Sequence, residues 1–311
     1  MTLILRVVEP GFFTSVQDLG RPNAMASGVP PGGAMDRFAH AAANLLVGND
    51  GSAATLECTI TGPHLVAEHA CLLAVTGADF DVRVNDRPIP MWTGVLLGEG
   101  DHLTVGAGGH GGRAYIAVAG GIAADRWLGS LSTNVMAARG GMHGRILIRG
   151  DAIESAGAPS GPAVSGRELQ PHMRPDYWSR SLHSIPGPHW KRLGPDGRRH
   201  FFHSEFTVSR NADRMGFRLD GPQLEMSGDE LLSFGLTAGA IQVPVRGQPI
   251  LLMADHQTAG GYPVVATVIS ASMPVAAQLV PGAKVSFVEA TIEDALRMRR
   301  QLQAALVSLR Q

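Results

Sequence analysis

The chain is most informative at residues 241–263, which read IQVPVRGQPILLMADHQTAGGYP. The runs IQVPV and PILLM are typical of short, buried β-strands. Four hydrogen-bonding side chains accompany these runs: Gln248 lies between them, and Asp255, His256 and Gln257 follow the second run and precede a double glycine. A purely structural segment rarely gathers so many polar groups between a buried strand and a turn. We therefore predict short strands that end in a binding site.

The same β pattern extends on both sides of this stretch. Residues 53–118 and 201–288 consist of short apolar runs separated by turn residues, including the breaks at 85–86 and 99–101. Gly and Pro, at 39 and 20 residues, make up about a fifth of the 311-residue chain, which fits many tight turns. This spacing predicts a mainly β fold, either an antiparallel barrel or a sandwich.

We expect two β-rich halves joined by a less regular segment. The N-terminal half is residues 1–150, the linker or surface excursion is 151–190, and the C-terminal half is 191–311. Apolar residues at helical spacing predict helices at 34–47 and 292–309, with a short one near 126–131. Thr291 and Asp294 fit the capping positions of the last helix. The similarity of GAMDRFA to ADRMGFRL hints at two similar barrels.

Composition and charge exclude several classes of protein. The formal net charge is −1, so the basic face that nucleic-acid binding requires is missing, as is an electrostatic membrane anchor. No apolar run is long enough to span a membrane and the N-terminus lacks a signal pattern, which predicts a cytoplasmic protein. The two cysteines, Cys58 and Cys71, have no metal-ligand spacing and read as buried thiols.

The early loop is the second candidate region. TSVQDLGR, residues 14–21, places Gln17, Asp18 and Arg21 within five positions. One interpretation is a local turn in which Asp18 bonds its own backbone and pairs with Arg21. The other is a polar wall for a small ligand.

GVPPGGAMD, residues 28–36, leads into the first predicted helix. Its glycines either direct backbone N–H groups at an anion or satisfy unusual backbone angles. The GK[ST] ending of a phosphate-binding P-loop is absent from the sequence. Asp36 lies in the first turn of this helix, where the helix dipole favours a carboxylate. A purely structural role is therefore one interpretation of Asp36.

A third group, residues 209–221, reads SRNADRMGFRLDG. Arg214 can bind a carboxylate or phosphate through two parallel hydrogen bonds. The alternative is an ion-pair network with Asp213. In the stretch at 241–263, Asp255 and His256 are neighbours that need not act together, and the amides of Gln248 and Gln257 can match both edges of a planar amide.

Several motifs occur in one order: TSVQDLGR, GVPPGGAMD, LECTITGP, ADRMGFRLDGP, the stretch at 241–263 and AQLVPGAKVSF. Together they resemble the allophanate hydrolase subunit 2 family, also called the biotin-dependent carboxyltransferase domain family. The resemblance extends from about residue 7 to residue 287. It implies two cyclophilin-like β-barrel-type halves with a few short helices and a C-terminal helix.

The resemblance also implies a heteromeric complex. A free-standing chain of this length looks most like a component of the ATP-dependent 5-oxoprolinase, which acts with subunits A and B to convert 5-oxo-L-proline to L-glutamate. Such a chain is expected to be inactive alone, with ATP bound mostly by its partners. Two alternatives remain open. One is the carboxyltransferase of a biotin-dependent, urea-type carboxylase, and the other is a non-catalytic regulatory partner of the subunit 1 relative.

Lactam, urea and biotin ring are all planar amides, which react when the carbonyl is polarised or the N–H proton is removed. The family motifs and residue types suggest a site without a metal ion, in which some residues are catalytic and others bind the substrate. Expected catalytic residues are Asp255, Arg214 and Arg21, and expected substrate-binding residues are Gln17, Asp36, Gln248, His256 and Gln257.

Three positions depart from the family pattern. Gly32 replaces the serine of SGAMD, Ala212 replaces the serine of SDRMG, and Ala271-Ser272 stands where an aspartate follows VIS. Each change removes or replaces a small polar group. If one of these polar groups binds the substrate in the family, we expect this chain to use a different substrate.

Overall fold

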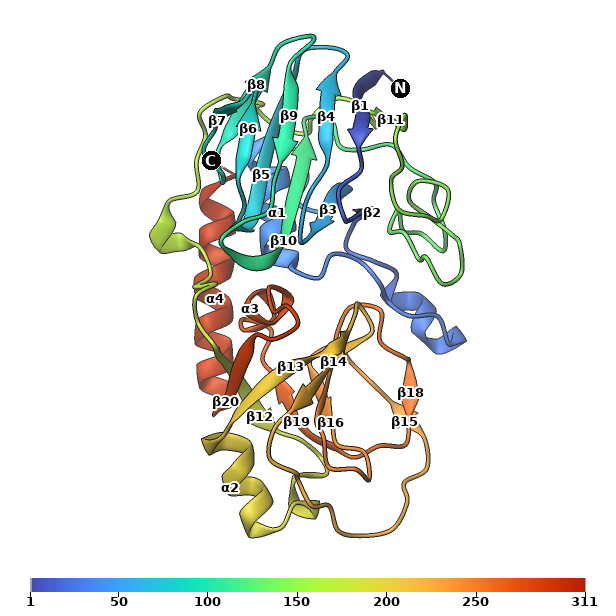
Figure 1. Ribbon diagram of the computed structural model, residues 1–311, viewed down its shortest axis with the longest axis vertical. Helices are drawn as coiled ribbons and strands as arrows, with labels where there is room; N and C mark the ends of the chain where they lie inside the picture. Colours follow the sequence, from blue (N-terminus) through green and yellow to red (C-terminus); the bar gives the residue numbers. More distant parts are fainter. Residues whose placement is uncertain (1, 311) are drawn as a thin grey trace. The chain divides into compact units, whose positions relative to one another are not determined.

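The computed structural model describes residues 2–310, which form a mainly β protein with a few helices, as predicted (Figure 1). The chain divides into two compact units. Unit 1 contains the N-terminal residues up to Arg21, then Gly32–Pro175, and the chain from Leu302 onward. Unit 2 contains Pro22–Pro31 and Asp176–Gln301.

Unit 1 is built on two antiparallel sheets. One has the order β11-β1-β4-β9-β6-β7 and the other the order β2-β3-β10-β5-β8. The first comprises β1 (Leu3–Glu9), β4 (His64–Ala67), β6 (Val82–Val84), β7 (Arg87–Pro88), β9 (His102–Val105) and β11 (Ala152–Glu154). The second comprises β2 (Phe13–Gln17), β3 (Thr55–Thr59), β5 (Cys71–Asp79), β8 (Gly94–Leu97) and β10 (His110–Val118).

The five-stranded sheet has two chemically different faces. Leu56 and Ile116 belong to the hydrophobic core that both sheets share. The alternating positions Ser15, Glu57 and Tyr115 are paired across β2, β3 and β10, so they lie side by side on the opposite face. Helix α1 (Arg37–Leu46) packs against β5 and β10. Unit 1 therefore buries a row of polar groups as well as an apolar core.

Unit 2 is a closed barrel of seven strands in the order β12-β19-β16-β17-β14-β13-β20. These are β12 (Ser181–Pro186), β13 (Glu205–Ala212), β14 (Gly216–Asp220), β16 (Ala240–Gln242), β17 (Ile250–Leu252), β19 (Val264–Val268) and β20 (Lys284–Glu289). In β14, Phe217 and Leu219 are buried while Arg218 and Asp220 are exposed, so Arg218 marks the outer face. A ribbon of β15 (Phe234–Gly235) and β18 (Ala259–Gly260) accompanies the barrel.

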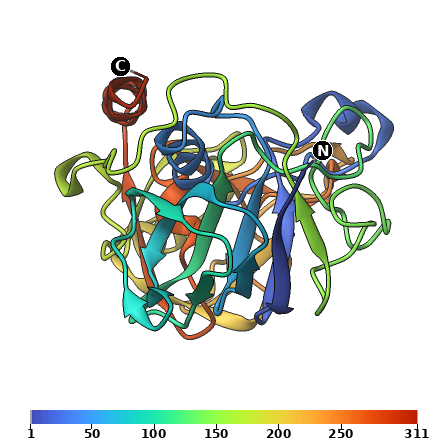
Figure 2. The same ribbon diagram turned by 90° about the horizontal axis from the view of Figure 1, so that it is seen from above.

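The remaining helices are short, except for the last. They are α2 (Pro195–His203), α3 (Met273–Ala277) and α4 (Ile292–Ser308), with 3-10 turns η1 (Pro22–Ser27), η2 (Pro171–Met173) and η3 (Trp190–Arg192). Figure 2 shows α4 end-on. As predicted, Thr291 Oγ1 accepts a hydrogen bond from the backbone N–H of Asp294, while the Asp294 carboxylate accepts one from the N–H of Thr291.

Several expectations differ from the structure. The mainly β fold with a closed barrel is confirmed, but that barrel is unit 2, and the strands of unit 1 form two sheets with another topology. The segment 151–190, expected as a linker or surface excursion, also contains β11 and β12, which pair within sheets. The short helix expected at 126–131 is replaced by a turn in which Leu128 has a φ of 48°. The expected apolar stripe of α4 is exposed at its start, where Ile292 and Leu296 are 63% and 48% accessible, and becomes buried toward its end, at Leu309.

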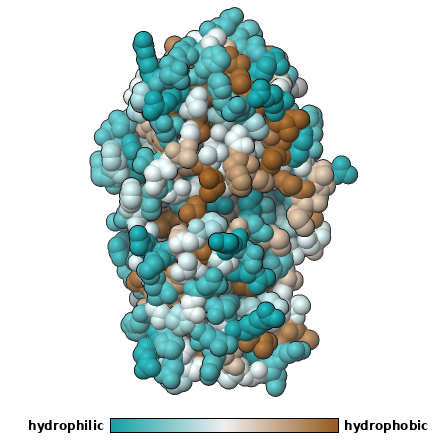
Figure 3. All heavy atoms as spheres, in the orientation of Figure 1, coloured by the Kyte–Doolittle hydropathy of each residue, from teal (hydrophilic) through white to brown (hydrophobic). Residues whose placement is uncertain are grey.

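The surface gives no sign of a membrane-spanning helix. Within residues 2–310, no helix is both long and apolar enough to cross a bilayer. On the face shown in Figure 3, hydrophilic and neutral groups predominate, and hydrophobic groups form several small patches. The described residues also contain no group of three or more histidine, cysteine or acidic side chains placed to hold a metal ion.

Candidate functional site

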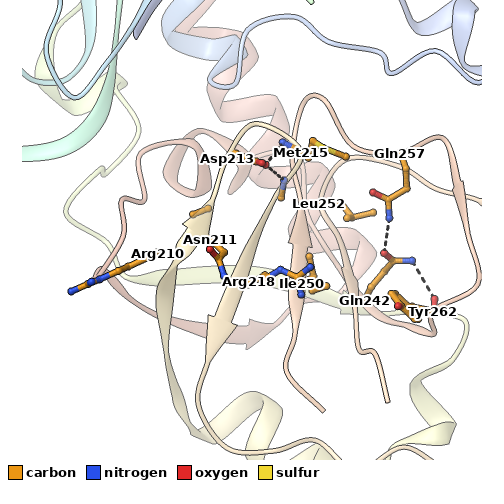
Figure 4. Close-up of a pocket in the computed structure, with 12 residues that line it drawn as sticks. Arg210, Asn211, Asp213, Met215, Arg218, Gln242, Ile250, Leu252, Gln257 and Tyr262 are labelled. Carbon is orange, nitrogen blue, oxygen red and sulfur yellow. Dashed lines mark hydrogen bonds between the residues drawn. The ribbon is translucent and has the colours of Figure 1, made fainter. Parts of the chain in front are cut away.

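A pocket of about 470 Å³ lies on the outer face of the barrel in unit 2 (Figure 4). Strand register builds its floor, because Arg218 of β14 pairs with Ile250 of β17, and Ile250 pairs with Gln242 of β16. The three side chains therefore share one face, and the outer two are two strand spacings apart, roughly 10 Å. Gln257 and Tyr262, from the segment between β17 and β19, complete the wall.

Two amides and a carbonyl form a hydrogen-bonded chain in this wall. Gln242 is fully buried, and its Nε2 donates to the carbonyl oxygen of Tyr262 at 3.3 Å. Its Oε1 accepts from Nε2 of Gln257 at 3.1 Å. Figure 4 shows the side-chain oxygen of Gln257 turned toward the other lining residues. The pocket therefore presents an amide oxygen that can accept a hydrogen bond from a ligand.

The pocket also has a cationic side. Arg218 is exposed, and in the described part of the chain no ion pair or hydrogen bond engages its guanidinium. Arg210 extends away from the other lining side chains in Figure 4. Asp213 is occupied locally, since its Oδ1 accepts from the N–H groups of Met215 and Gly216 at 2.7 and 3.2 Å. Arg218 is thus the group best placed to bind an anion.

Arg214 and Asp255 form a bidentate ion pair beside the pocket. Arg214 Nε and Nη2 donate to the two carboxylate oxygens of Asp255 at 2.8 and 3.2 Å. The backbone N–H of Asp255 donates to the carbonyl of Arg214 at 2.7 Å. The pair cross-links the β13–β14 turn to the segment that carries Gln257. Arg214 thus forms an ion pair with Asp255, a partner that the sequence did not suggest.

His256 is almost completely buried next to Asp255. Burial lowers its pKa, and this outweighs the hydrogen bond to the Gln257 carbonyl and the charge of Asp255. Its Nδ1 lies 2.7 Å from that carbonyl oxygen, which can only accept, so Nδ1 carries the hydrogen and Nε2 keeps the lone pair. Gln248 does not line the pocket; its Nε2 donates to the carbonyl of Gly221 at 3.4 Å.

In unit 1, Asp18 is the centre of a buried hydrogen-bond network. Its Oδ1 accepts from the hydroxyls of Ser130 and Ser132, both at 2.6 Å, and from the N–H of Gly20 at 2.7 Å. Its Oδ2 accepts from the N–H of Leu131 at 2.6 Å. Burial alone would raise the pKa of Asp18, but these four hydrogen bonds outweigh it and hold the pKa below 3.8. The expected local turn is present, and it is one part of a longer-range anchor.

Gln17 and Arg21 bind the same distant segment. Gln17 Nε2 donates to the carbonyl of Thr133 at 3.4 Å and to Ser15 Oγ at 3.0 Å. The Arg21 guanidinium donates to the carbonyl of Ser132 and lies 4.8 Å from the centre of the Trp127 ring. Both side chains are buried, with 1% and 2% exposure. Arg21 thus contacts Trp127 and Ser132 of that segment.

The distant segment is a surface excursion, residues 124–145, drawn green in Figure 1. Non-glycine residues with positive φ occur within it at Leu128, Ala138 and His143. Such backbone conformations are unfavourable and persist where the surroundings hold them. Hydrogen bonds from the TSVQDLGR motif fix much of this excursion, so the motif has a structural role.

Asp36 also has a structural role. It is fully buried and caps α1, because its Oδ1 accepts from the N–H of Ala39 at 2.9 Å. The loop before the helix is fixed by the sheet below it. Glu57 accepts hydrogen bonds from the N–H of Met35 and the hydroxyl of Tyr115, each at 2.8 Å, and that hydroxyl accepts from the N–H of Asp36. Substrate binding by Asp36 stays a prediction.

The three departures from the family pattern have different surroundings. Gly32 has a φ of 65°, a conformation in which a serine would be strained. Ser272 is buried, and its hydroxyl accepts from the N–H of His183 at 3.2 Å. Ala212 lines the pocket, so the hydroxyl that a serine would supply is missing from this wall.

The expected site residues thus form two groups. Gln17, Arg21 and Asp36 are buried in unit 1, whereas Arg214, Gln248, Asp255, His256 and Gln257 belong to unit 2. Of the second group Gln257 lines the pocket. Sequence reasoning missed Gln242 and Tyr262. A readable signal for Gln242 existed, namely an amide inside the otherwise apolar run AIQVPV.

Comparison with known proteins identifies relatives along the whole chain. The C subunit of 5-oxoprolinase from Escherichia coli (strain K12) is 38% identical over 303 residues, which cover 96% of each chain. The protein of the same name from Haemophilus influenzae is 31% identical over 95% of this chain and 94% of its own. The crystal structure of Kluyveromyces lactis urea carboxylase matches 99% of this chain with a TM-score of 0.93 and 28% identity, and the match covers 29% of that chain.

Residues 27–289 match the family model described as "Carboxyltransferase domain, subdomain A and B". This match covers most of the chain and includes the pocket. The chain belongs to this carboxyltransferase domain family.

Proposed function

We propose that this chain is the C subunit of a 5-oxoprolinase, a cytoplasmic complex that uses ATP to open 5-oxo-L-proline to L-glutamate together with subunits A and B. The observation that carries the proposal is the end-to-end match to two proteins that bear the name of the 5-oxoprolinase C subunit, at 38% and 31% identity. In contrast, the urea carboxylase match occupies 29% of a longer chain.

The pocket chemistry supports this substrate. 5-Oxo-L-proline is a planar cyclic amide with a carboxylate on the ring. Arg218 can bind the carboxylate with charge-assisted hydrogen bonds, and Gln257 Oε1 can accept the ring N–H. The Arg214–Asp255 pair holds Gln257 in place. Under this proposal Asp255 and Arg214 position the wall.

We assign ATP to the partner subunits. Arg218 is the guanidinium that lies among the lining side chains, whereas Arg210 extends away from them (Figure 4), and one guanidinium suits one carboxylate better than the several charges of a triphosphate. ATP would supply the phosphoryl group that activates the amide carbonyl, while the residues of this chain hold and orient the lactam.

The test is glutamate release from 5-oxo-L-proline by the purified complex of all three proteins, with and without this chain. We expect release to depend on ATP and on the chain. Release that is unchanged without the chain would overturn the proposal.

A urea-type carboxyltransferase is the second candidate, favoured by the TM-score of 0.93 over 99% of this chain. Transfer from carboxybiotin to urea by the complex, in place of lactam opening, would establish it. A purely regulatory role would appear as neither reaction together with inhibition of the partner's activity.

A further inference from the structure

We propose that Gln242 is a positioning residue that fixes the orientation of the Gln257 carboxamide, so that the pocket selects ligands with an N–H donor over ligands of the same shape with a ring oxygen. This rests on the proposed function for the identity of the ligand. It goes further by naming the residue that sets donor-against-acceptor specificity.

The backbone carbonyl oxygen of Tyr262 determines how both amide side chains in the wall are oriented. The backbone carbonyl of Tyr262 can only accept, so the Gln242 atom 3.3 Å from it must be the nitrogen. The Gln242 oxygen is then turned to Gln257 and requires a donor there. The Gln257 nitrogen fills this need at 3.1 Å. The oxygen of Gln257 therefore faces the pocket (Figure 4).

Packing prevents Gln242 from turning over. It is fully buried on β16, between Ile250 of β17 and Val264 of β19. A Cβ at Gly260 would lie 3.4 Å from its Nε2, so the glycine keeps the covering ribbon close to the amide. A flipped Gln242 would place its oxygen against the Tyr262 carbonyl and leave buried groups unpaired, which is strongly disfavoured.

The chemical consequence concerns the ring atom of the ligand. A lactam presents N–H to the Gln257 oxygen, whereas the corresponding lactone presents a ring oxygen, and two acceptors repel. Sites built to hydrogen-bond a substrate group reject analogues that lack it far more strongly than apolar pockets reject a missing methylene. Both ligands carry the same carboxylate, so Arg218 does not distinguish them.

The experiment compares 5-oxo-L-proline with its lactone analogue, 5-oxotetrahydrofuran-2-carboxylate, in the complex of all three proteins. The readouts are kcat and KM for the lactam and the inhibition constant of the lactone. In the wild type we expect the lactam to be favoured by roughly 10-fold to 100-fold. Gln242→Met keeps the shape but removes both polar atoms, and should reduce this preference at least 10-fold, mainly through KM.

Gln242→Glu separates positioning from packing. A protonated glutamic acid can donate to the Tyr262 carbonyl and accept from Gln257, whereas the carboxylate cannot donate. The lactam preference should therefore recover as the pH is lowered in Gln242→Glu, while Gln242→Met shows no such recovery. The control is Gln223→Met, which removes an exposed amide that donates to the Arg246 carbonyl at 3.1 Å outside the pocket, and should leave the preference unchanged.

A second readout does not depend on activity. In ¹⁵N-labelled chain, the side-chain NH₂ of Gln257 should exchange slowly in the wild type and rapidly in Gln242→Met. Slow exchange in both, or a lactam preference that Gln242→Met leaves intact, overturns the inference. If exchange responds as expected but the complex releases no glutamate, the orientation of Gln257 is upheld and the proposed function fails.

Discussion

Replacing Asp18 by asparagine tests whether one carboxylate holds the excursion at residues 124–145. Asn keeps the shape and can place its oxygen where Oδ1 accepts from Gly20, Ser130 and Ser132. Its nitrogen then faces the N–H of Leu131, which Oδ2 accepts at 2.6 Å in the wild type. Two donors would meet in a site that is 8% exposed at Asp18.

The expected cost can be worked out bond by bond. Three hydrogen bonds lose the charge assistance that roughly doubles their strength, which is about 0.7 kcal/mol each. The Leu131 N–H loses its acceptor, which costs about 1–2 kcal/mol. Because such effects are not additive, we expect a loss of about 2–4 kcal/mol in the free energy of unfolding.

The assay is denaturant unfolding of wild type and Asp18→Asn over a range of pH. Since the folded-state pKa of Asp18 lies below 3.8, its stabilisation is present above that pH and is lost as the pH falls through the folded pKa. The difference between the proteins should thus be full near neutrality and shrink below about pH 4. Trypsin should also cleave the variant faster after Arg126 and Arg139, which lie in the excursion.

Asp81→Asn is the matched control, because Asp81 forms an ion pair with Arg83 and is half exposed. It should change the unfolding free energy by less than about 0.5 kcal/mol. An Asp18→Asn protein that unfolds like this control at neutral pH would refute the anchoring role of Asp18.

Three further predictions concern the pocket and the two units. Arg218→Ala should raise the KM for 5-oxo-L-proline roughly 10-fold to 100-fold through the loss of charge-assisted bonds, with little change in kcat, whereas Arg210→Ala should leave KM within about 3-fold. Gly260→Ala should destabilise unit 2 by about 1–3 kcal/mol, since its Cβ would lie 3.1 Å from a Leu236 methyl, while Gly235→Ala, with open space around it, should not. Burial lowers the pKa of His40 from 6.5 to about 4. The unfolded chain therefore binds the proton first, and stability should fall by roughly 3 kcal/mol as pH drops from 6.5 to 4 in the wild type but not in His40→Gln.

Local pattern was enough to predict strands, turns and caps. The alternation of buried and exposed residues in β14 is visible in GFRLD, and the box formed by Thr291 and Asp294 is visible in TIED. Polar residue types also drew attention to the stretch that contains Gln257, which lines the pocket. These features depend on neighbours in the chain.

Features that depend on distant partners could not be predicted. The row from Arg218 to Gln242 exists because three strands pair in one register, and a shift of a single residue would turn these side chains to the other face. Ser130 and Ser132 resemble ordinary turn residues, and only the fold brings them to Asp18, more than a hundred positions away. Arg214 likewise pairs with Asp255, which lies 41 positions away in the sequence.

The barrel of unit 2 closes through a parallel pair between β12 and β20, in which Ser181 lies opposite Ser286. These residues are 105 positions apart. Closure of so long a loop carries a large entropic cost before the pairing contributes, which slows folding. During synthesis, β12 leaves the ribosome long before its partner exists and waits as an unpaired edge. Closure of the barrel is therefore a late step of folding, and the interval before it is when the unpaired strand edge is most exposed to aggregation.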